Sequence, residues 1–228
     1  MLVALTRERG RNEELRRLVA RLADVVETPL TMTTFRDPHV VGEEIRESPH
    51  FGSYCSLVVT SARAQSYVGS ALEAMMNPYE VLSVGSATTE MLARERVSVT
   101  HESSGLALGL ASFITRGPVL VLGAVGGRDE LLADLTKRQL HPVLVECYET
   151  VPVELDDEAR QRVRRADVVF IGAPSAWRVA RTLVPQNAWV LVPGATTLEF
   201  VRADHERVLL GWGEQFDAAW EHVGASVI

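Results

Sequence analysis

A buried strand that runs into a small-residue turn and then a helix occurs four times in this chain, as two similar pairs. The first pair covers residues 56–63 and 81–90, and the second covers residues 167–176 and 190–197. Internal duplication constrains architecture strongly, so we expect two similar α/β units. The N-terminus of each helix carries free N–H groups and a partial positive charge, which favours a ligand rich in carboxylates or phosphates.

Length and composition are typical of a folded protein without a membrane segment. The 228 residues suffice for one large domain or two small ones, and 46% of them are hydrophobic. Apolar runs such as residues 119–125 are much shorter than the roughly 20 residues that span a bilayer. Charged residues (Arg7, Glu8 and Arg9) follow the first apolar run at once. We therefore expect no signal peptide, no membrane partner and a cytoplasmic location.

Charge and ligand-forming residues exclude several classes of function. The net charge of −7 and the lack of a basic face argue against nucleic-acid binding. The six histidines show no metal-ligand spacing, and Cys55 and Cys147 lie in apolar runs typical of buried thiols. We expect no metal and no cofactor. Because the overall charge does not attract an anion, local amides and selected arginines have to hold one.

Strands and helices alternate along most of the chain, which predicts an α/β fold with parallel sheets flanked by helices. Strands are predicted near 56–60, 80–84, 97–101, 118–122, 142–149, 167–171, 188–192 and 207–211, and helices near 62–76, 87–95, 104–115, 127–140, 156–165, 174–183, 195–203 and 214–223. Two extended stretches, 28–36 and 146–153, interrupt this rhythm, and we expect them to form a two-stranded linker. Residues 1–30 with 152–228 then form one domain and residues 36–145 the other. Such a linker places a ligand cleft between the domains, at the carboxyl ends of the strands.

Five strand-to-helix turns contain small residues and hydroxyls, and they begin at Thr60, Gly85, Gly123, Gly172 and Gly194. Helix capping alone explains any one of them, because Ser and Thr cap helices generally. Five such turns at the carboxyl edges of sheets favour an anion cleft. The Gly123 turn lacks the Lys-Ser/Thr end of a P-loop, so nucleotide binding has little support.

No familiar catalytic set stands out in the sequence. There is no Ser/His/Asp set, Cys/His pair or nucleophile elbow. Tyr148 is the one large polar side chain placed in a linker stretch. A packing role and a proton-donating role are both open for it at this point.

The motifs, taken in order, resemble those of the uroporphyrinogen-III synthase family. They are Leu5-Thr6-Arg7, Val58-Val59-Thr60-Ser61-Ala62-Arg63-Ala64, Val84-Gly85-Ser86-Ala87-Thr88, a Gly-rich turn, and Tyr148-Glu149-Thr150-Val151. The resemblance spans nearly the whole chain. It implies two similar α/β domains joined by a two-stranded linker, in a monomer. It also implies closure of hydroxymethylbilane to uroporphyrinogen III, with inversion of ring D through a spiro intermediate and loss of water.

The resemblance also implies roles for particular residues. Tyr148 corresponds to a family tyrosine that helps the hydroxyl leave as water. The candidate substrate-binding residues lie in the turns, and they are Thr60, Ser61, Arg63, Ser86, Thr88, Gly126, Arg128, Ser175, Ala176, Thr196 and Thr197. The acetate and propionate arms of the substrate fit a cleft lined by helix N-termini. Because the substrate is itself reactive, holding it in the correct orientation can replace strong acid or base groups.

Three turns depart from the family pattern. The second-copy strand ends in Ile171-Gly172 instead of a Thr-Ser pair, and the last turn reads Pro193-Gly194-Ala195 where the family has Gly-Pro. Gly123-Ala124 stands where the family often has an arginine. Two alternatives to the synthase therefore stay open: a non-catalytic relative with the same cleft, and a bilobal module that binds or senses another small anion.

Overall fold

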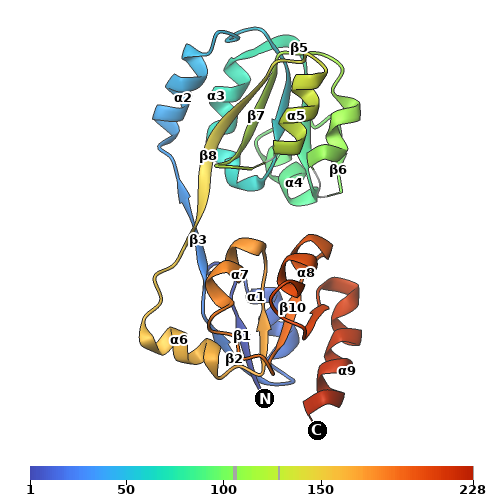
Figure 1. Cartoon of the computed structure of the whole chain (residues 1–228). Coiled ribbons are helices and arrows are strands. Elements are labelled where there is room, and N and C mark those ends of the chain that lie inside the picture. Colours follow the sequence, from blue (N-terminus) through green and yellow to red (C-terminus); the bar gives the residue numbers. More distant parts are fainter. Residues whose placement is uncertain (105–106, 128, 228) are drawn as a thin grey trace. The chain divides into compact units, whose positions relative to one another are not determined.

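The computed structural model describes residues 1–104, 107–127 and 129–227, and it divides into two compact units (Figure 1). Unit 1 contains Met1–Thr33 and Thr150–Ile228, and unit 2 contains Thr34–Glu149. The chain passes from one unit to the other twice, within β3 (Thr31–Phe35) and within β8 (Pro142–Pro152). These two strands run antiparallel, since the Arg36 amide donates to the Cys147 carbonyl and the Val153 amide donates to the Leu30 carbonyl.

In the described part of the chain, unit 1 is built on a five-stranded sheet of order β11-β10-β9-β1-β2. All neighbouring strands in it are parallel. Its elements are β1 (Leu2–Leu5), α1 (Glu13–Val19), β2 (Asp24–Glu27), α6 (Asp157–Arg164), β9 (Val168–Phe170), α7 (Pro174–Ala180), β10 (Trp189–Val192), α8 (Ala195–Arg202), β11 (Val208–Leu210), the 3-10 helix η3 (Gly213–Gln215) and α9 (Phe216–Val227).

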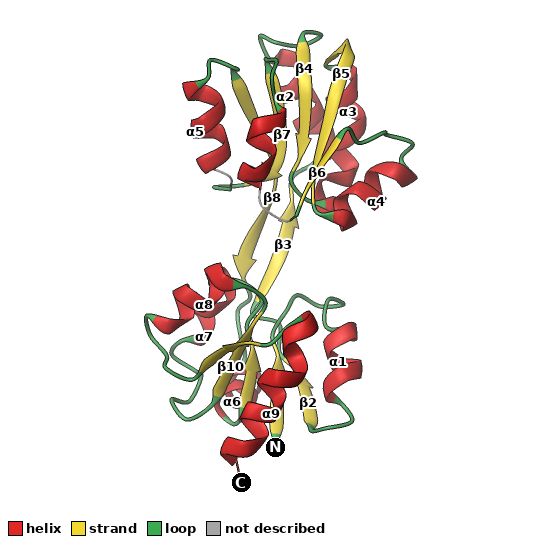
Figure 2. Ribbon diagram, turned by 90° about the vertical axis from the view of Figure 1, so that its right-hand side faces the viewer, coloured by secondary structure: helices red, strands yellow, loops and turns green. Residues whose placement is uncertain are grey.

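Helices cover both faces of the unit 1 sheet, as Figure 2 shows. On one face Val169 and Val190 pack against α6, α7 and α8. The buried Trp177 of α7 belongs to the same cluster. On the other face Phe170 and Leu191 pack against α1 and α9. Parallel strands buried on both faces need apolar side chains at successive positions, which explains why these strands do not alternate between polar and apolar residues.

Unit 2 is built on a six-stranded sheet, again counted over the described residues, of order β3-β8-β7-β4-β5-β6. Its five strands other than β3 are parallel. The remaining elements are α2 (Pro38–Glu47), β4 (Tyr54–Val59), the 3-10 helix η1 (Ala62–Tyr67), α3 (Val68–Glu73), β5 (Met75–Val84), α4 (Ser86–Arg94), β6 (His101–Ser103), the 3-10 helix η2 (Ala107–Phe113), β7 (Val119–Ala124) and α5 (Asp129–Lys137).

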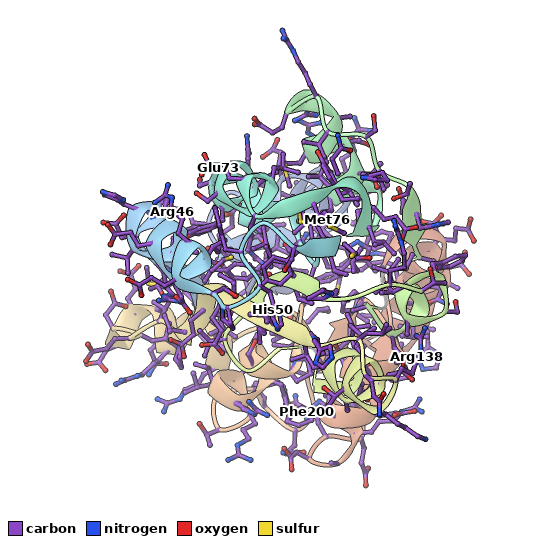
Figure 3. The ribbon with its side chains drawn as sticks, turned by 90° about the horizontal axis from the view of Figure 1, so that it is seen from above. Arg46, His50, Glu73, Met76, Arg138 and Phe200 are labelled. Atoms are coloured by element: carbon purple, nitrogen blue, oxygen red, sulfur yellow. The ribbon has the colours of Figure 1, made fainter. Side chains whose placement is uncertain are left out.

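The unit 2 sheet is also covered on both faces. Helices α2, η1, α3 and α4 pack on the face that presents Leu57 of β4, and η2 and α5 pack on the face that presents Val58. Arg46 of α2 and Glu73 of α3, both labelled in Figure 3, form an ion pair at 3.7 Å that joins the two helices at their surface. Because this pair is solvent-exposed, it adds little to stability. Burial of apolar side chains is what stabilises the packing of these helices on the sheet.

The two sheets have the same strand order once β9 is aligned with β4. Strand β10 then corresponds to β5, β11 to β6, β1 to β7 and β2 to β8. The faces agree as well when Val168, which pairs with Val3, is aligned with Ser56, which pairs with Val119. Val3 and Val119 then both lie on the face away from the helices that follow β9 and β4. Unit 1 is therefore a circularly permuted copy of the unit 2 arrangement. This confirms the duplication that the sequence predicts, because the two repeated pairs form β4 with β5 and β9 with β10.

The α/β fold with parallel sheets flanked by helices is as predicted, but several elements differ from the prediction. The strand predicted at 97–101 is β6, which begins later and is shorter. The α-helix predicted at 104–115 is instead the 3-10 helix η2 over its described residues. Asn12 is the N-cap residue of α1, but its side chain makes no capping hydrogen bond; its amide donates instead to the Arg7 carbonyl at 3.2 Å. None of the helices in the described residues is both long enough and apolar enough to cross a membrane.

Candidate functional site

The predicted turns lie at the carboxyl ends of the parallel strands in both units. In unit 2 the chain goes from β4 to β5 and β6 on one side of the sheet, and then to β7 and β8 on the other. The strand order therefore switches direction between β4 and β7, and in unit 1 it switches between β9 and β1. Ligands of open α/β sheets bind at such switch points. We name the two carboxyl edges by their residues: edge 1 contains 6–9, 171–175, 193–197 and 211–213, and edge 2 contains 60–63, 85–88, 123–127 and 146–148.

A threonine hydroxyl joins the two central strands at each switch point. On edge 2, the Thr60 hydroxyl donates to the Leu122 carbonyl at 2.9 Å. On edge 1, the Thr6 hydroxyl donates to the Phe170 carbonyl. Thr60 and Thr6 are only 3% and 0% exposed. The proton of Thr60, a predicted substrate contact, is thus used inside the fold.

Three α-helices that begin directly after parallel strands have no side-chain cap among the described residues. The N-cap residues of α4, α7 and α8 are Gly85, Ala173 and Gly194. In contrast, Asp37 caps α2 and Asp156 caps α6, with carboxylate-to-amide distances of 2.8 Å and 2.7 Å. These two capped helices follow β3 and β8. The N–H groups that precede the first hydrogen bond of an uncapped helix have no partner within the helix and are available to a ligand.

On edge 1, α8 presents the predicted contacts Thr196 and Thr197 in its first turn. The first hydrogen bond of this helix runs from the Leu198 amide to the Gly194 carbonyl at 3.0 Å. The amides of Thr196 and Thr197 therefore precede the first intrahelical bond. The Thr196 side chain is exposed and the Thr197 side chain is buried. This helix offers a ligand two amides and one accessible hydroxyl.

The predicted contacts on α7 differ from each other. Ser175 is half-buried in the first turn. Ala176 belongs to the hydrophobic core of unit 1, and its amide donates to the Ala173 carbonyl at 3.1 Å. Ser175 can therefore contact a ligand at edge 1, whereas the Ala176 amide already has a partner.

On edge 2, the predicted hydroxyl residues also have different surroundings. The Ser61 hydroxyl accepts from the Arg63 amide at 3.3 Å and caps η1. Ser86 is the first residue of α4 and is exposed. The Thr88 hydroxyl donates to the Val84 carbonyl at 2.8 Å, and this side chain is 3% exposed. Ser86 is thus the accessible hydroxyl on α4, and Thr88 stabilises the turn that positions it.

The glycine-rich turn after β7 already binds a carboxylate from its own unit. Gly126 is in the left-handed conformation (φ 62°), and its amide donates to Glu146 Oε1 at 3.2 Å. A carboxylate is the group that an acetate or propionate arm presents, so the geometry of this turn suits such a ligand. Arg128, which is predicted to bind substrate next to this turn, lies outside the described residues.

Tyr148 lies on β8 with Arg63 above its ring. The guanidinium carbon of Arg63 is 5.9 Å from the ring centroid, and the Phe35 ring packs beside Tyr148 at 6.2 Å. Tyr148 is 5% exposed. Two predicted site residues from distant parts of the sequence are therefore neighbours. A cation over the face of an aromatic ring is a favourable contact, and it fixes both side chains.

Arg7 is a charged residue on edge 1 whose role is not predicted from the sequence. Its guanidinium carbon lies 4.7 Å from the centroid of the Trp212 ring, and its Nη1 donates to the Arg11 carbonyl at 2.9 Å. Leu5-Thr6-Arg7 is one of the motifs that carry the family resemblance. The signal that identifies Arg7 as an edge residue is the register of β1 with β9, which becomes clear only in the structure.

The two cysteines lie inside unit 2, and Cys147 is strongly perturbed. Burial raises the pKa of the Cys147 thiol from 9.0 to about 12. Its thiol is therefore neutral near pH 7 and serves as core packing, as expected for a buried cysteine. Among the described residues, no group of three or more His, Cys, Asp or Glu side chains is arranged to hold a metal ion.

Comparisons with known proteins agree with this geometry. The family model described as uroporphyrinogen-III synthase HemD matches residues 13–208. A mutant uroporphyrinogen III synthase from Thermus thermophilus is similar with a TM-score of 0.65 and 15% identity, and the alignment covers 100% of this chain and 98% of that one. The uroporphyrinogen-III synthetase from Helicobacter pylori has a TM-score of 0.61 and 14% identity, with 98% of each chain covered.

At these identities the solved structures show the shared fold, and the family model shows the family. A comparison with curated protein sequences gives no significant match. The family match extends from α1 to the first residue of β11, so it includes the switch point of unit 2 and the β9 side of the switch point of unit 1. The chain belongs to the uroporphyrinogen-III synthase HemD family.

Proposed function

We propose that this chain is an active uroporphyrinogen-III synthase of tetrapyrrole biosynthesis, a lyase that closes hydroxymethylbilane to uroporphyrinogen III with inversion of ring D and loss of water. Family membership supports the reaction. The structural observation that carries the proposal is the set of uncapped helix N-termini at the edges, on α4 in unit 2 and on α8 in unit 1. The first-turn amides of these helices suit carboxylates, and the substrate bears acetate and propionate arms on every pyrrole.

Orientation is the main contribution of the protein in this proposal. The amides of Thr196 and Thr197 and the hydroxyls of Ser86 and Ser175 hold substrate carboxylates, and Arg63 adds a positive charge at edge 2. Bound in this way, the substrate brings its reactive methylene to the ring carbon that gives the inverted product. Such positioning lowers the barrier without a strong acid or base.

Tyr148 assists the departure of the leaving group. Its hydroxyl donates a proton to the hydroxyl of the hydroxymethyl group, so that the C–O bond breaks and water leaves. The electron pair for this step comes from the adjacent pyrrole. The proton that the ring system releases after closure restores the tyrosine. The contact of Tyr148 with Arg63 keeps the ring fixed in place on edge 2.

The family match also bears on the alternatives. A sensing module for an unrelated small anion is not favoured, because the matched family is that of the synthase and the match covers both units. As further parts of the proposal, the two units are the two domains expected from the sequence, and the enzyme acts as a cytoplasmic monomer. Its substrate chemistry needs only the side chains and amides described above.

The isomer of the product tests the proposal. Purified protein is given freshly made hydroxymethylbilane, the products are oxidised, and the type I and type III uroporphyrins are separated. Unassisted closure gives type I, so a predominance of type III supports the synthase. Type I at the rate seen with heat-denatured protein would refute it.

A further inference from the structure

Arg7 is held at the switch point of unit 1 by contacts on several sides. It directly follows β1, next to the end of β9. Its guanidinium carbon lies 4.7 Å above the Trp212 ring, and one N–H group bonds the Arg11 carbonyl. The side chain is half-buried. A guanidinium held in this way loses little further freedom when it binds an anion, and it retains the forked donor geometry that matches a carboxylate.

The glycine at position 172 makes room for this arrangement. A Cβ atom added to Gly172 would lie 3.3 Å from Arg7 Cγ and 3.9 Å from Arg7 Nε. An added side chain there would therefore crowd Arg7, whose Cγ would have to move by a few tenths of an ångström. Gly172 is one of the departures from the family pattern, which has a Thr-Ser pair at this turn. The turn that has no Thr-Ser pair is thus also the turn that a charged side chain approaches closely.

The corresponding position of unit 2 carries no charge. When the sheet faces are matched, Val3 corresponds to Val119, so Arg7 corresponds to Gly123. Edge 2 has its own arginine on an aromatic ring, because Arg63 lies over Tyr148. Each edge therefore has one arginine fixed against an aromatic side chain. In a chain with a net charge of −7, such local positive charge is needed to hold an anionic ligand.

We infer that Arg7 binds a carboxylate arm of the substrate at edge 1, and that Trp212 and Gly172 are positioning residues that hold its guanidinium in place. This inference rests on the proposed function for the identity of the substrate. The carboxylate chemistry itself follows from the guanidinium, its half-buried setting and its place at a switch point. The contact between Arg7 and this arm replaces the hydroxyl contacts that this turn lacks.

The chain offers a matched control for the experiment. Arg207 lies 5.6 Å above the Trp189 ring, in the same unit, but Trp189 is the first residue of β10 and so marks the opposite end of the sheet. Arg7→Gln and Arg207→Gln therefore remove the same charge and the same kind of ring contact. Uroporphyrin III, a stable macrocycle with the same acetate and propionate arms, serves as the binding probe, followed by tryptophan fluorescence. Thermal unfolding of each variant is recorded alongside.

Arg7→Gln is expected to weaken uroporphyrin III binding about tenfold, as is typical of losing one charge-assisted hydrogen bond, and to raise KM more than it lowers kcat. Arg207→Gln is expected to leave the dissociation constant unchanged. Arg7→Lys, which keeps the charge, is expected to recover part of the affinity, and Gly172→Ala, which keeps Arg7 but crowds it, to lose several-fold.

Equal dissociation constants for the wild type, Arg7→Gln and Arg207→Gln would overturn the inference. If Arg7→Gln does not fold, Gly172→Ala and Arg7→Lys decide it, and wild-type affinity in both would count against it. The isomer assay on the wild type separates this result from the proposed function. A wild type that forms type III while Arg7→Gln binds normally would refute only the role of Arg7.

Discussion

At the scale of single residues, the hydroxyls at the edges have two different tasks. Those of Thr6, Thr60 and Thr88 are buried and donate to backbone carbonyls, so they fix the ends of strands. Those of Ser86 and Thr196 are exposed in the first turns of uncapped helices. The residue type alone does not separate the two groups. Substitutions in the first group should change stability, and substitutions in the second should change substrate binding.

Thr60→Val is expected to lower the free energy of unfolding by about 1 kcal/mol, the usual contribution of one hydrogen bond. The effect stays small because the Leu122 carbonyl also accepts from the Thr60 amide at 3.1 Å. Denaturant unfolding measures it, and Thr60→Ser, which keeps the hydroxyl, is the control. An unchanged stability with a large rise in KM would mean instead that this hydroxyl contacts substrate.

Tyr148→Phe is expected to lower kcat at least tenfold and to change KM much less, since general acid assistance typically contributes a factor of about 100 or more. Steady-state kinetics with hydroxymethylbilane measure both constants. Tyr67→Phe is the matched control, because Tyr67 is a buried tyrosine of the same unit whose hydroxyl donates to the Arg36 carbonyl at 2.7 Å. That variant should lose stability and keep kcat. An unchanged kcat in Tyr148→Phe would remove this residue from the mechanism.

The buried Cys147 thiol predicts a loss of stability in alkali. Its pKa is raised by burial from 9.0 to about 12, so the unfolded chain releases this proton first. The stabilisation is complete below about pH 9 and is lost as pH rises towards the folded-state pKa. Between about pH 8.5 and pH 10 the free energy of unfolding should fall by about 1 kcal/mol from this group.

Denaturant unfolding at several pH values tests this, with Cys147→Ala as the comparison. The variant is less stable throughout but should show a flatter pH dependence over this interval. Burial also raises the pKa of Tyr54 and Tyr67, so their deprotonation adds to the loss only at higher pH. Equal slopes for the wild type and Cys147→Ala below pH 10 would contradict the assignment.

At the scale of helices, the N-caps distinguish structural from ligand-facing ends. Asp37 and Asp156 cap α2 and α6 with their own carboxylates. The N-cap residues of α4 and α8 are Gly85 and Gly194, which provide no such group. An uncapped start costs stability unless a ligand supplies the missing acceptor. This difference is the physical basis for placing substrate carboxylates at the edges.

Gly194→Asp should stabilise the protein and weaken substrate binding at once. The backbone at Gly194 is extended, and a Cβ there has open space, so an aspartate fits and can cap α8. We expect a gain of about 0.5 kcal/mol in the free energy of unfolding. KM should rise about tenfold, because the new carboxylate occupies the amides that the substrate arm would use.

Two control variants sharpen this test. Gly194→Asn caps the helix without a charge, and Gly194→Ala fits the site without a cap. The increase in KM should be largest for Asp, smaller for Asn and small for Ala. A stabilised Gly194→Asp variant with wild-type KM would show that the α8 amides do not bind substrate.

Most elements can be predicted from the sequence, because their signals are local. Apolar runs such as 56–60 and 118–122 have the length and flanking turns of buried parallel strands, and they are β4 and β7. The 3-10 helix η2 could not be distinguished from an α-helix, since both show similar apolar spacing. The accessible and buried hydroxyls of the turns could not be separated either, because burial depends on contacts between distant strands. Only such contacts bring Arg63 to Tyr148 and Arg7 to Trp212.

At the scale of the whole molecule, duplication and permutation explain where the site residues come from. Each sheet has the same order around its switch point, but unit 1 takes its β1 and β2 from the start of the chain and its other strands from the end. The repeat in the sequence reveals the two copies, and it does not reveal that β1 fills the place of β7. For this reason the sequence indicates the turns after β9 and β10 but misses the arginine after β1.

The most direct test of the account is the fraction of type III isomer formed as the protein concentration is raised at a fixed amount of hydroxymethylbilane. Spontaneous closure to type I competes with the enzyme, so each addition of active protein diverts more substrate. We predict that the type III fraction rises with protein concentration until it dominates the product. A type III fraction that stays at the level of the protein-free reaction at every concentration would contradict the account.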